Sequence, residues 1–434
     1  MQLQMPKRYF FILIFLSVSA ISFQSCNDQP INIPLFKDTT QLYGTSSQLI
    51  EGMLYAEKTE SYQVSLYLRP KLFIGQWEDY KSITLLRFYN VPDTLSYLTK
   101  SDIISVKLTL TPDKYQFGDL DDPRLEFDVM NLDKQMDIGL EWRDVFGEDG
   151  TSSYFDENSK VRFDTTLSYN AINTEEPPTY SIDLPKETAI RWFYLQSNYK
   201  KDTSFASELK TNFQIALVPT ENSKIIQRFD NSNEISNESI SPKIRVKYKN
   251  KLGDTISVTF NKASSYTLNN TTEPEENTLT IQNGFLSRFY MEFDLSSIPK
   301  NKSIIRTEFR LTLDTSKSKF GTYGSDSLII STDYYVDIRT QPAAWSYIGL
   351  LDEDKETFII PKLNPIIEAY LYSEDTLITN KLLKLSFTNI KDGNSLRSTN
   401  ELYLFNRFVF YGSDAIDPKK RPQLKIIYAD RANY

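Results

Sequence analysis

The segments SITLLRFYNV (residues 82–91) and IISVKLTLT (residues 103–111) decide the fold. Apolar and polar side chains alternate along both segments, and Ile, Val, Leu and Thr predominate. Alternation with a period of two places apolar side chains on one face of a β-strand, where β-branched residues are favoured. The same alternation recurs in KIRVKYK (243–249), IIRTEFRLTLD (304–314) and QLKIIYA (423–429). The chain is therefore predicted to be an all-β protein.

The strand-like segments fall into two sets that match in the same order, which indicates an internal repeat. VKLTL at residues 106–110 corresponds to FRLTL at residues 309–313, and Trp142 corresponds to Trp345, in each case 203 residues later. Three further pairs are LLRF with YMEF at Phe88 and Phe293, LPKETAIRWFYLQS (184–197) with IPKLNPIIEAYLYS (360–373), and SPKIRVKY (241–248) with RPQLKIIY (421–428).

These landmarks predict two tandem copies of one domain, at residues 46–249 and 253–429, joined at KNKLGD. Beyond the leader the chain has about 400 residues, which are too many for one β core and suit two domains. Each copy has short strands, longer irregular loops and a closing Pro-x-hydrophobic-x-hydrophobic-Tyr strand. This pattern is typical of an antiparallel β-sandwich of the jelly-roll kind. In LPKETAIRWFYLQS the apolar residues have helical spacing, and Pro185 suits the first turn of a short helix.

The segments SITLLRFYNVPD…DIISVKLTLT and YMEFDLSSIPKNKSIIRTEFRLTL resemble the DNRLRE-type β-sandwich. In that family a strand ending in Leu-Arg-Phe-Asp precedes a Leu-Pro turn and an I-x-x-A-x-L-x-L strand. A later Trp and a terminal R-P-x-L-x-x-x-Y strand also recur, as Trp142, Trp345 and residues 421–428 do here. The resemblance covers most of both copies and implies a secreted or surface bacterial protein, some relatives being carbohydrate-binding modules for acidic polysaccharide. The chain departs from the pattern at Glu292, which replaces the Arg of LLRF in the second copy.

A leader precedes the predicted domains. Lys7 and Arg8 are followed by the apolar run YFFILIFLSVSAI at residues 9–21, which is shorter than the ~20 residues that a helix needs to cross a bilayer. This is the anatomy of a cleaved secretory signal, predicted at residues 1–25. Cys26 directly follows a small residue and resembles the lipidated cysteine of bacterial lipoproteins. The alternative is an ordinary signal peptide that leaves a free cysteine near the new terminus.

Cys26 is the one cysteine of the chain. A lone thiol in an oxidising envelope would invite intermolecular pairing, which favours its modification by lipid. The several acyl chains of a lipoprotein make a lasting membrane tether, whereas one chain binds only marginally. Residues 26–45 lack periodicity and are predicted to be a tether. The expected location is the cell envelope, with the protein anchored in the outer membrane on its periplasmic or surface face.

The composition limits the partners and the chemistry. Without Lys7 and Arg8 the chain has 47 basic and 57 acidic residues, a net charge of −10, which opposes binding to nucleic acid and to anionic headgroups. The absence of histidine excludes a Ser-His-Asp or Cys-His nucleophile and the usual zinc sites. No catalytic residue is predicted. A carboxylate pair that acts on glycosides is an alternative, although no spacing selects one pair.

Two kinds of residue are candidates for a site. The segment GDLDD (118–122) clusters oxygen ligands of the kind that calcium binds, which makes Asp119, Asp121 and Asp122 candidate ligands. GEDG…DEN, at residues 147–158, is a second cluster of this kind. The alternative is that such Asp-rich loops are solvated turns.

Aromatic residues that occur in only one copy are the second kind. Trp77, in GQWEDYKS with Tyr80, lies opposite Gln282, and Trp192 lies opposite Glu368. Sugar rings stack on exposed aromatic faces, so Trp77, Tyr80 and Trp192 are candidate ligand contacts; each could instead pack on a local loop. Trp142 and Trp345, which occupy equivalent positions in the two copies, are predicted to fill core positions.

The sequence thus predicts a lipid-anchored, non-catalytic binding protein that captures polysaccharide at the cell surface. The alternative is a structural or adhesive lipoprotein that contacts protein partners in the envelope.

Overall fold

The computed structural model contains two large antiparallel β-sheets. The predicted leader, Cys26, the tether and Trp345 lie outside the described residues. Within the described part no helix has the length and apolar composition needed to cross a membrane. The described residues are 48–51, 53–60, 65–67, 71–88, 95, 97–137, 139–148, 150–173, 178–199, 213–231, 240–270, 279–284, 288–295, 298, 302–322, 330–334, 348–365, 367–368, 383–389 and 404–430.

The first sheet contains twelve described strands, which pair antiparallel throughout. Its main path has the order β10-β6-β13-β14-β5-β11-β8-β9. The strands are β3 (Ser65–Tyr67), β4 (Lys71–Trp77), β5 (Tyr80–Phe88), β6 (Ile103–Leu110), β7 (Pro112–Gly118), β8 (Arg124–Leu132), β9 (Phe155–Thr166), β10 (Tyr180–Leu184), β11 (Gln214–Pro219), β12 (Ile225–Asp230), β13 (Lys243–Lys249) and β14 (Thr255–Asn270).

The second sheet contains nine described strands in the order β1-β23-β17-β20-β19-β18-β21-β16-β2, and β15 and β22 form a separate pair. The strands are β1 (Gln48–Glu51), β2 (Met53–Glu60), β15 (Leu279–Gln282), β16 (Arg288–Asp294), β17 (Lys302–Thr312), β18 (Ile330–Tyr334), β19 (Ile348–Leu351), β20 (Thr357–Pro361), β21 (Leu383–Asn389), β22 (Arg407–Phe410) and β23 (Gln423–Asp430). The helices with given bounds are α2 (Trp142–Phe146), α3 (Tyr169–Ile172), α4 (Lys186–Tyr199) and the 3₁₀ helix η6 (Pro418–Lys420).

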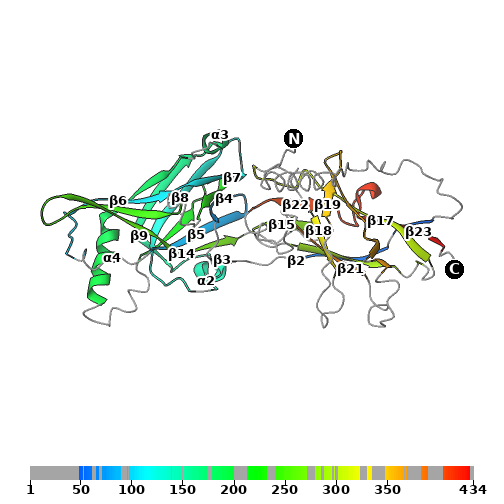
Figure 1. Cartoon of the computed structure of the whole chain (residues 1–434), viewed down its shortest axis with the longest axis horizontal. Coiled ribbons are helices and arrows are strands. Elements are labelled where there is room, and N and C mark those ends of the chain that lie inside the picture. The colour runs from blue at the N-terminus through cyan, green and yellow to red at the C-terminus, as the bar shows by residue number, and fades with distance from the viewer. Residues whose placement is uncertain are drawn as a thin grey trace, which may run out of the picture. The chain divides into compact units, whose positions relative to one another are not determined.

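The all-β prediction is confirmed (Figure 1), and so is the short helix at LPKETAIRWFYLQS. That helix is α4, which begins directly after Pro185 and lies beside β6. The strand SITLLRF lies in β5, and the structure buries both of its faces. Leu86 and Phe88 belong to the largest core cluster, whereas Ile83 and Leu85 pack on a second cluster that includes α2. The polar residues Ser82 and Thr84 are buried as well, and the hydroxyl of each donates to the carbonyl of Phe73.

Two strands of each sheet have corresponding neighbours. In the first sheet β6 lies between β10 and β13, and β5 lies between β14 and β11. In the second sheet β17 lies between β20 and β23, and β16 lies between β2 and β21. Three pairs of these strands carry matching sequence segments: β5 and β16, β6 and β17, and β13 and β23. The division into two domains at the predicted boundaries remains a prediction.

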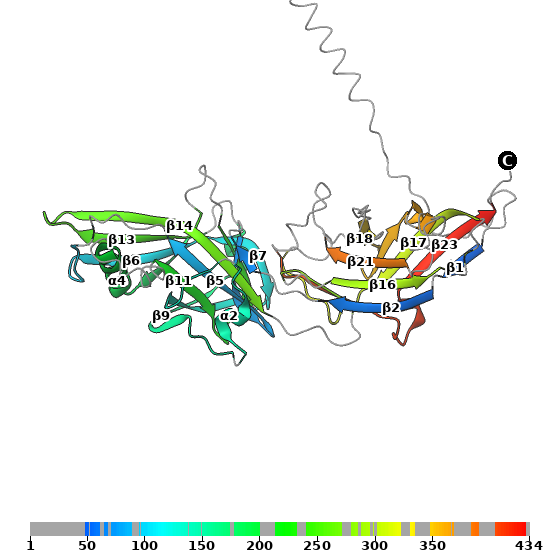
Figure 2. The same cartoon turned by 90° about the horizontal axis from the view of Figure 1, so that it is seen from below.

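The pairing crosses those predicted boundaries in both directions. Residues 48–60, assigned by sequence to the first copy, complete the second sheet, because β1 pairs with β23 and β2 with β16 (Figure 2). Residues 255–270, assigned to the second copy, complete the first sheet as β14. The segment KNKLGD, predicted as a link between domains, contains the tight turn of the β13–β14 hairpin. A short turn makes this pairing favourable because closing a short loop costs little entropy.

Candidate functional site

The candidate ligand residue Trp77 ends β4, and Tyr80 begins β5 after a two-residue turn. The two residues are direct cross-strand partners, and their rings stack with centroids 6.2 Å apart at 13°. Glu78 has a φ of 52°, in the left-handed region that tight hairpin turns require. The sequence GQWEDYKS thus forms a hairpin that sets two aromatic rings side by side.

Only one of these two rings is available to a ligand. Trp77 is half-buried, whereas Tyr80 is 2 % exposed and its hydroxyl accepts a hydrogen bond from Nη1 of Arg407 at 2.7 Å. Burial raises the pKa of the Tyr80 phenol. The prediction that Tyr80 touches a ligand is therefore corrected. The Tyr80 ring is part of the core and packs against the Trp77 ring.

An aromatic cluster fixes this hairpin within the fold. Tyr80 packs in one buried cluster with residues from the far end of the chain, among them Phe405. The hydroxyl of Tyr115 donates to Oδ1 of Asn406 at 3.0 Å and accepts the backbone N–H of Phe405 at 2.8 Å. Trp77 makes an edge-to-face contact with Phe117 of the same cluster, with centroids 5.1 Å apart. The indole is therefore held by a packed aromatic base, as a pre-formed binding surface requires.

Trp77 opens into a hollow of about 450 Å³, which we call the Trp77 pocket. Gly118, at the end of β7, has a φ of +132°, and a Cβ there would lie 3.1 Å from Cγ of Trp77 and 2.5 Å from the carbonyl oxygen of Lys224. The missing side chain lets the β7 backbone approach the indole closely. The lining residues are Trp77, Phe117, Gly118, Asp119, Leu120, Asp121, Lys319 and Phe320.

Three charged side chains lie in this pocket. Nζ of Lys319 lies 5.4 Å from the centroid of the Trp77 ring, and the Lys319 backbone is held by two hydrogen bonds to Arg407, of 2.9 and 2.8 Å. Asp119 and Asp121 line the pocket from the loop that follows β7. The structure thus brings the candidate tryptophan and two of the candidate aspartates together in one place.

The calcium prediction is not supported by the geometry of that loop. Oδ1 of Asp119 accepts the backbone N–H groups of Asp121 and Asp122, each at 3.2 Å, and the carboxylate of Asp122 pairs with Lys224. The three carboxylates therefore form and flank a turn and do not converge on one point. No group of three potential ligands that could hold a metal ion occurs among the described residues.

The two other tryptophans among the described residues, Trp142 and Trp192, belong to packed regions. Trp192, predicted as a ligand contact, is 1 % exposed on α4 and packs on Phe213 with centroids 5.2 Å apart. This prediction is corrected because a side chain in the core cannot reach a ligand. Trp142 stacks on Phe146 at 4.3 Å and packs against a core cluster. The helical pattern of α4 could have identified Trp192 as a core residue, since its neighbour Phe193 is also apolar.

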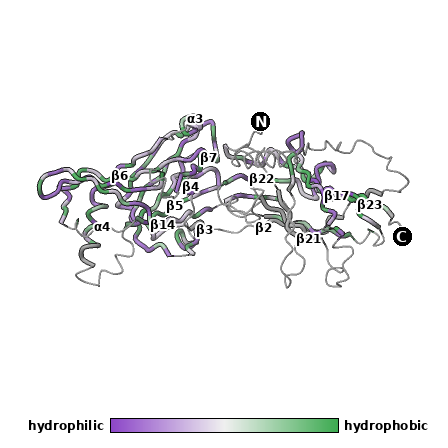
Figure 3. Tube along the Cα trace, viewed as in Figure 1, coloured by the Kyte–Doolittle hydropathy of each residue, from purple (hydrophilic) through white to green (hydrophobic). Residues whose placement is uncertain are grey.

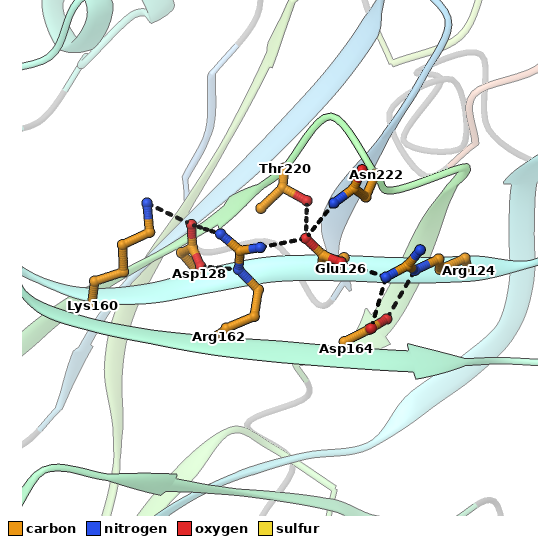
Figure 4. Close-up of polar contacts among 8 residues, drawn as sticks. All are labelled: Arg124, Glu126, Asp128, Lys160, Arg162, Asp164, Thr220 and Asn222. Atoms are coloured by element: carbon orange, nitrogen blue, oxygen red, sulfur yellow. Dashed lines mark hydrogen bonds and ion pairs between the residues drawn. The ribbon is translucent and has the colours of Figure 1, made fainter.

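Sequence reasoning missed a network of charged residues on β8 and β9 (Figure 4). Glu126 and Asp128, both nearly buried, lie two residues apart on β8 and both pair with Arg162 of β9. Arg124 donates to Glu126 at 2.8 Å, and Lys160 lies 3.0 Å from Asp128. The signal was present in RLEFD (124–128) and SKVRFD (159–164), where charged residues alternate with apolar ones. Such alternation places the charges on one face of paired strands.

This network borders a second hollow, of about 470 Å³. Hydrogen bonds from the Thr220 hydroxyl and the Asn222 amide, with the charges of Arg162 and Arg124, hold the pKa of Glu126 below its usual range despite desolvation. A carboxylic acid that donates a proton in glycoside cleavage needs a raised pKa. Glu126 is therefore poorly suited to be that acid. Its ion pair with Arg162, like that of Asp128, links β8 to β9.

Comparison with protein-family models finds no model that matches this chain, and a search of curated proteins finds no match.

Proposed function

We propose that this protein is a non-catalytic polysaccharide-binding protein that takes a neutral glycan in the Trp77 pocket. The observation that carries the proposal is the half-buried Trp77, set on an aromatic base and bordered by two carboxylates and an ammonium group. Binding pockets combine an apolar or aromatic surface with a few polar groups that orient the ligand. A sugar ring presents C–H groups to an indole and hydroxyl groups to the charged side chains around it.

The charges of the pocket favour a neutral ligand. The lining contains two carboxylates, Asp119 and Asp121, and one ammonium group, Lys319, so its formal net charge is about −1. A uronate or sulfate group would meet repulsion from the two carboxylates. Sugar hydroxyls both donate and accept, and so can bond to the aspartates and to the lysine.

The resemblance to DNRLRE-type sandwiches supports the binding of glycan in general, because some members of that family bind carbohydrate. The leader supports the second part of the proposal, which is that lipid on Cys26 holds the protein in the cell envelope. A tethered binding protein would keep polysaccharide close to the membrane without needing high affinity, since tethering raises the effective concentration.

Affinity electrophoresis of the mature chain through gels that contain single neutral polysaccharides tests the proposal, and titration calorimetry then gives the affinity. Trp77→Ala should weaken binding by roughly 10-fold, the loss expected for one aromatic stacking contact. Asp121→Asn removes a pocket charge at an exposed position and should weaken binding several-fold while leaving the fold intact.

Tyr194→Ala is the matched control, because Tyr194 is 57 % exposed on α4, outside the pocket. It should leave the affinity unchanged. Failure of every neutral glycan to retard the chain would contradict the proposal, as would a loss of binding that is equal in the Trp77 and Tyr194 variants.

A further inference from the structure

Strand β13 carries a row of basic side chains on one face. Lys243, Arg245, Lys247 and Lys249 occupy alternate positions, and the last three are exposed. Figure 3 shows hydrophilic colour along the hairpin that β13 and β14 form at the end of β6. Alternate residues of a strand point to the same face about 7 Å apart, so the row spans roughly 20 Å.

The strands on either side add little negative charge to this face. The register places Lys107 of β6 and Thr259 of β14 beside Arg245. Among the described strands β10, β6, β13 and the first half of β14, Asp183 is the one acidic residue, and its carboxylate lies 3.4 Å from Nζ of Lys107. No ion pair of Arg245, Lys247 or Lys249 occurs within the part of the chain that the structure describes. The face is therefore locally cationic in a chain whose net charge is −8.

The turn of the hairpin presents an apolar side chain. Oδ1 of Asn250 accepts the backbone N–H groups of Leu252 and Asp254, each at 2.9 Å, and the N–H of Gly253 bonds to the Asn250 carbonyl at 3.0 Å. These bonds hold a compact turn with Leu252 at its apex, where its side chain is 86 % exposed between Lys251 and Gly253. The turn is held by the Asn250 side chain and by backbone hydrogen bonds, so the Leu252 side chain is not needed to stabilise it.

Other exposed apolar residues lie at the same end of the sheet. Ile104 is 42 % exposed, Tyr97 is 38 % exposed and Ile256 is 37 % exposed. Nζ of Lys251 lies 4.8 Å from the centroid of the Tyr97 ring, which places Tyr97 against the turn. Grouped apolar residues on a surface mark contacts with a membrane or a partner.

We propose that this end of the β13–β14 hairpin docks on an anionic lipid surface, with Leu252 entering the headgroup region and the lysines of β13 pairing with lipid phosphates. The tip combines the exposed Leu252 with Lys251, Lys249 and a tyrosine, and Asp254 is the one acidic residue of the turn. Apolar, basic and aromatic side chains together are typical of interfacial membrane contacts. A soluble polyanion would use the charges alone and would gain nothing from Leu252. The proposal does not depend on the Trp77 pocket.

The acidic net charge does not oppose such docking. Electrostatic interactions through water decay over about 10 Å at ~0.1 M salt, so a surface senses the nearest charges and not the sum over the chain. Each basic residue close to an anionic bilayer improves binding roughly five-fold. Lys247, Lys249 and Lys251 together therefore suffice for measurable attraction.

Sedimentation with lipid vesicles tests the proposal, using the chain from residue 26 onward with Cys26→Ser, so that no acyl chain contributes. Vesicles that contain phosphatidylglycerol should bind this chain, pure phosphatidylcholine vesicles should bind it far less, and binding should fall steeply as salt rises. The pair Lys247→Gln and Lys249→Gln should weaken the partition coefficient roughly 30-fold. Leu252→Ser should weaken it roughly 10-fold, because less apolar surface enters the headgroups.

Lys355→Gln with Lys419→Gln is the matched control, since it removes two exposed lysines elsewhere in the chain and the same net charge. This control and Trp77→Ala should both bind vesicles like the parent chain, which keeps this proposal distinguishable from the glycan proposal. An equal loss in the control, or no preference for phosphatidylglycerol, would overturn the proposal. Binding to soluble polygalacturonate that needs the β13 lysines and ignores Leu252, with no vesicle binding, would overturn it in favour of a polyanion.

Discussion

Strands β13 and β23 occupy equivalent positions in the two sheets, because β13 pairs with β6 and β23 pairs with β17. The strand that pairs with the other edge comes from a different part of the chain in each sheet. The neighbour of β13 is the first half of β14, which follows it after a tight turn. The neighbour of β23 is β1, which lies more than 370 residues earlier in the chain. The same pairing order is thus reached once by a local hairpin and once by the joining of distant segments.

The outer faces of these two strands differ as well. Lys243, Arg245 and Lys247 of β13 correspond in the sequence repeat to Gln423, Lys425 and Ile427 of β23, which are half-buried. The local hairpin of the first sheet extends to an exposed turn and can carry a surface for binding. Equivalent strand positions thus lead to an exposed hairpin turn in the first sheet and to pairing with the distant strand β1 in the second.

The largest effect is expected when the distant segment is removed. Deletion of residues 48–60 removes β1 and β2, which lie at the two ends of the strand order in the second sheet. The edges of β23 and β16 would then lose their backbone partners, and the second sheet should unfold while β5 and β13 keep theirs. Hydrogen exchange read by mass spectrometry checks this, with loss of protection in β16, β17 and β23.

Deletion of residues 27–45 is the control, because it shortens the predicted tether and leaves every described strand intact. It should leave the exchange pattern unchanged. Equal loss of protection in β5 and β13 after the first deletion would show that the two sheets unfold as one unit and would break the comparison.

The next effect concerns Trp192 and Glu368, which the repeat places at equivalent positions. Trp192→Ala should lower the free energy of unfolding by about 3–5 kcal/mol, because it leaves a cavity against Phe213 in the core. Glu368→Ala should change it by less than about 0.5 kcal/mol at a half-buried surface position. Urea denaturation curves of both variants measure the difference. If Trp192→Ala changed the free energy of unfolding only slightly and weakened glycan binding, Trp192 would again be a candidate ligand residue.

Local periodicity was sufficient to predict the all-β fold, from alternating side chains, and the helix α4, from helical spacing. The sequence did not assign residues 48–60 to the second sheet, because the residues of a strand do not show which distant strand will pair with it. It could not separate Trp77 from Tyr80 either. The two residues share a hairpin, and only the packing around Arg407 and Phe405 buries the second ring.

The basic row on β13 was visible in KIRVKYK, yet the acidic net charge of the whole chain argued against anionic surfaces. A sum over the chain averages charges that the fold separates by more than the screening length. The network of Glu126 and Arg162 was hidden for a different reason. Its partners lie 36 residues apart, and only the antiparallel register of β8 and β9 brings them together.

The smallest effect concerns Lys262, at the point where β14 passes from β13 to β5. The equivalent point in the second sheet is the step from β1 to β2. Lys262 is 4 % exposed, its Nζ donates to the carbonyl of Asn231 at 3.1 Å, and burial lowers its pKa from 10.5 to about 8. Between pH 8 and 10.5 the unfolded chain therefore holds the proton more tightly than the folded chain. In this window the stability contributed by this group rises with pH, by at most about 1.4 kcal/mol per pH unit.

Lys262→Met should remove this rise and should stabilise the protein at pH 7 by about 1–2 kcal/mol, because no charge is then buried. Urea denaturation at several pH values between 7 and 10.5 measures both effects. Lys355→Met, at an exposed position, is the control and should keep the slope of the parent chain. A slope that persists in Lys262→Met would assign the titration to another group and would contradict the lowered pKa of Lys262.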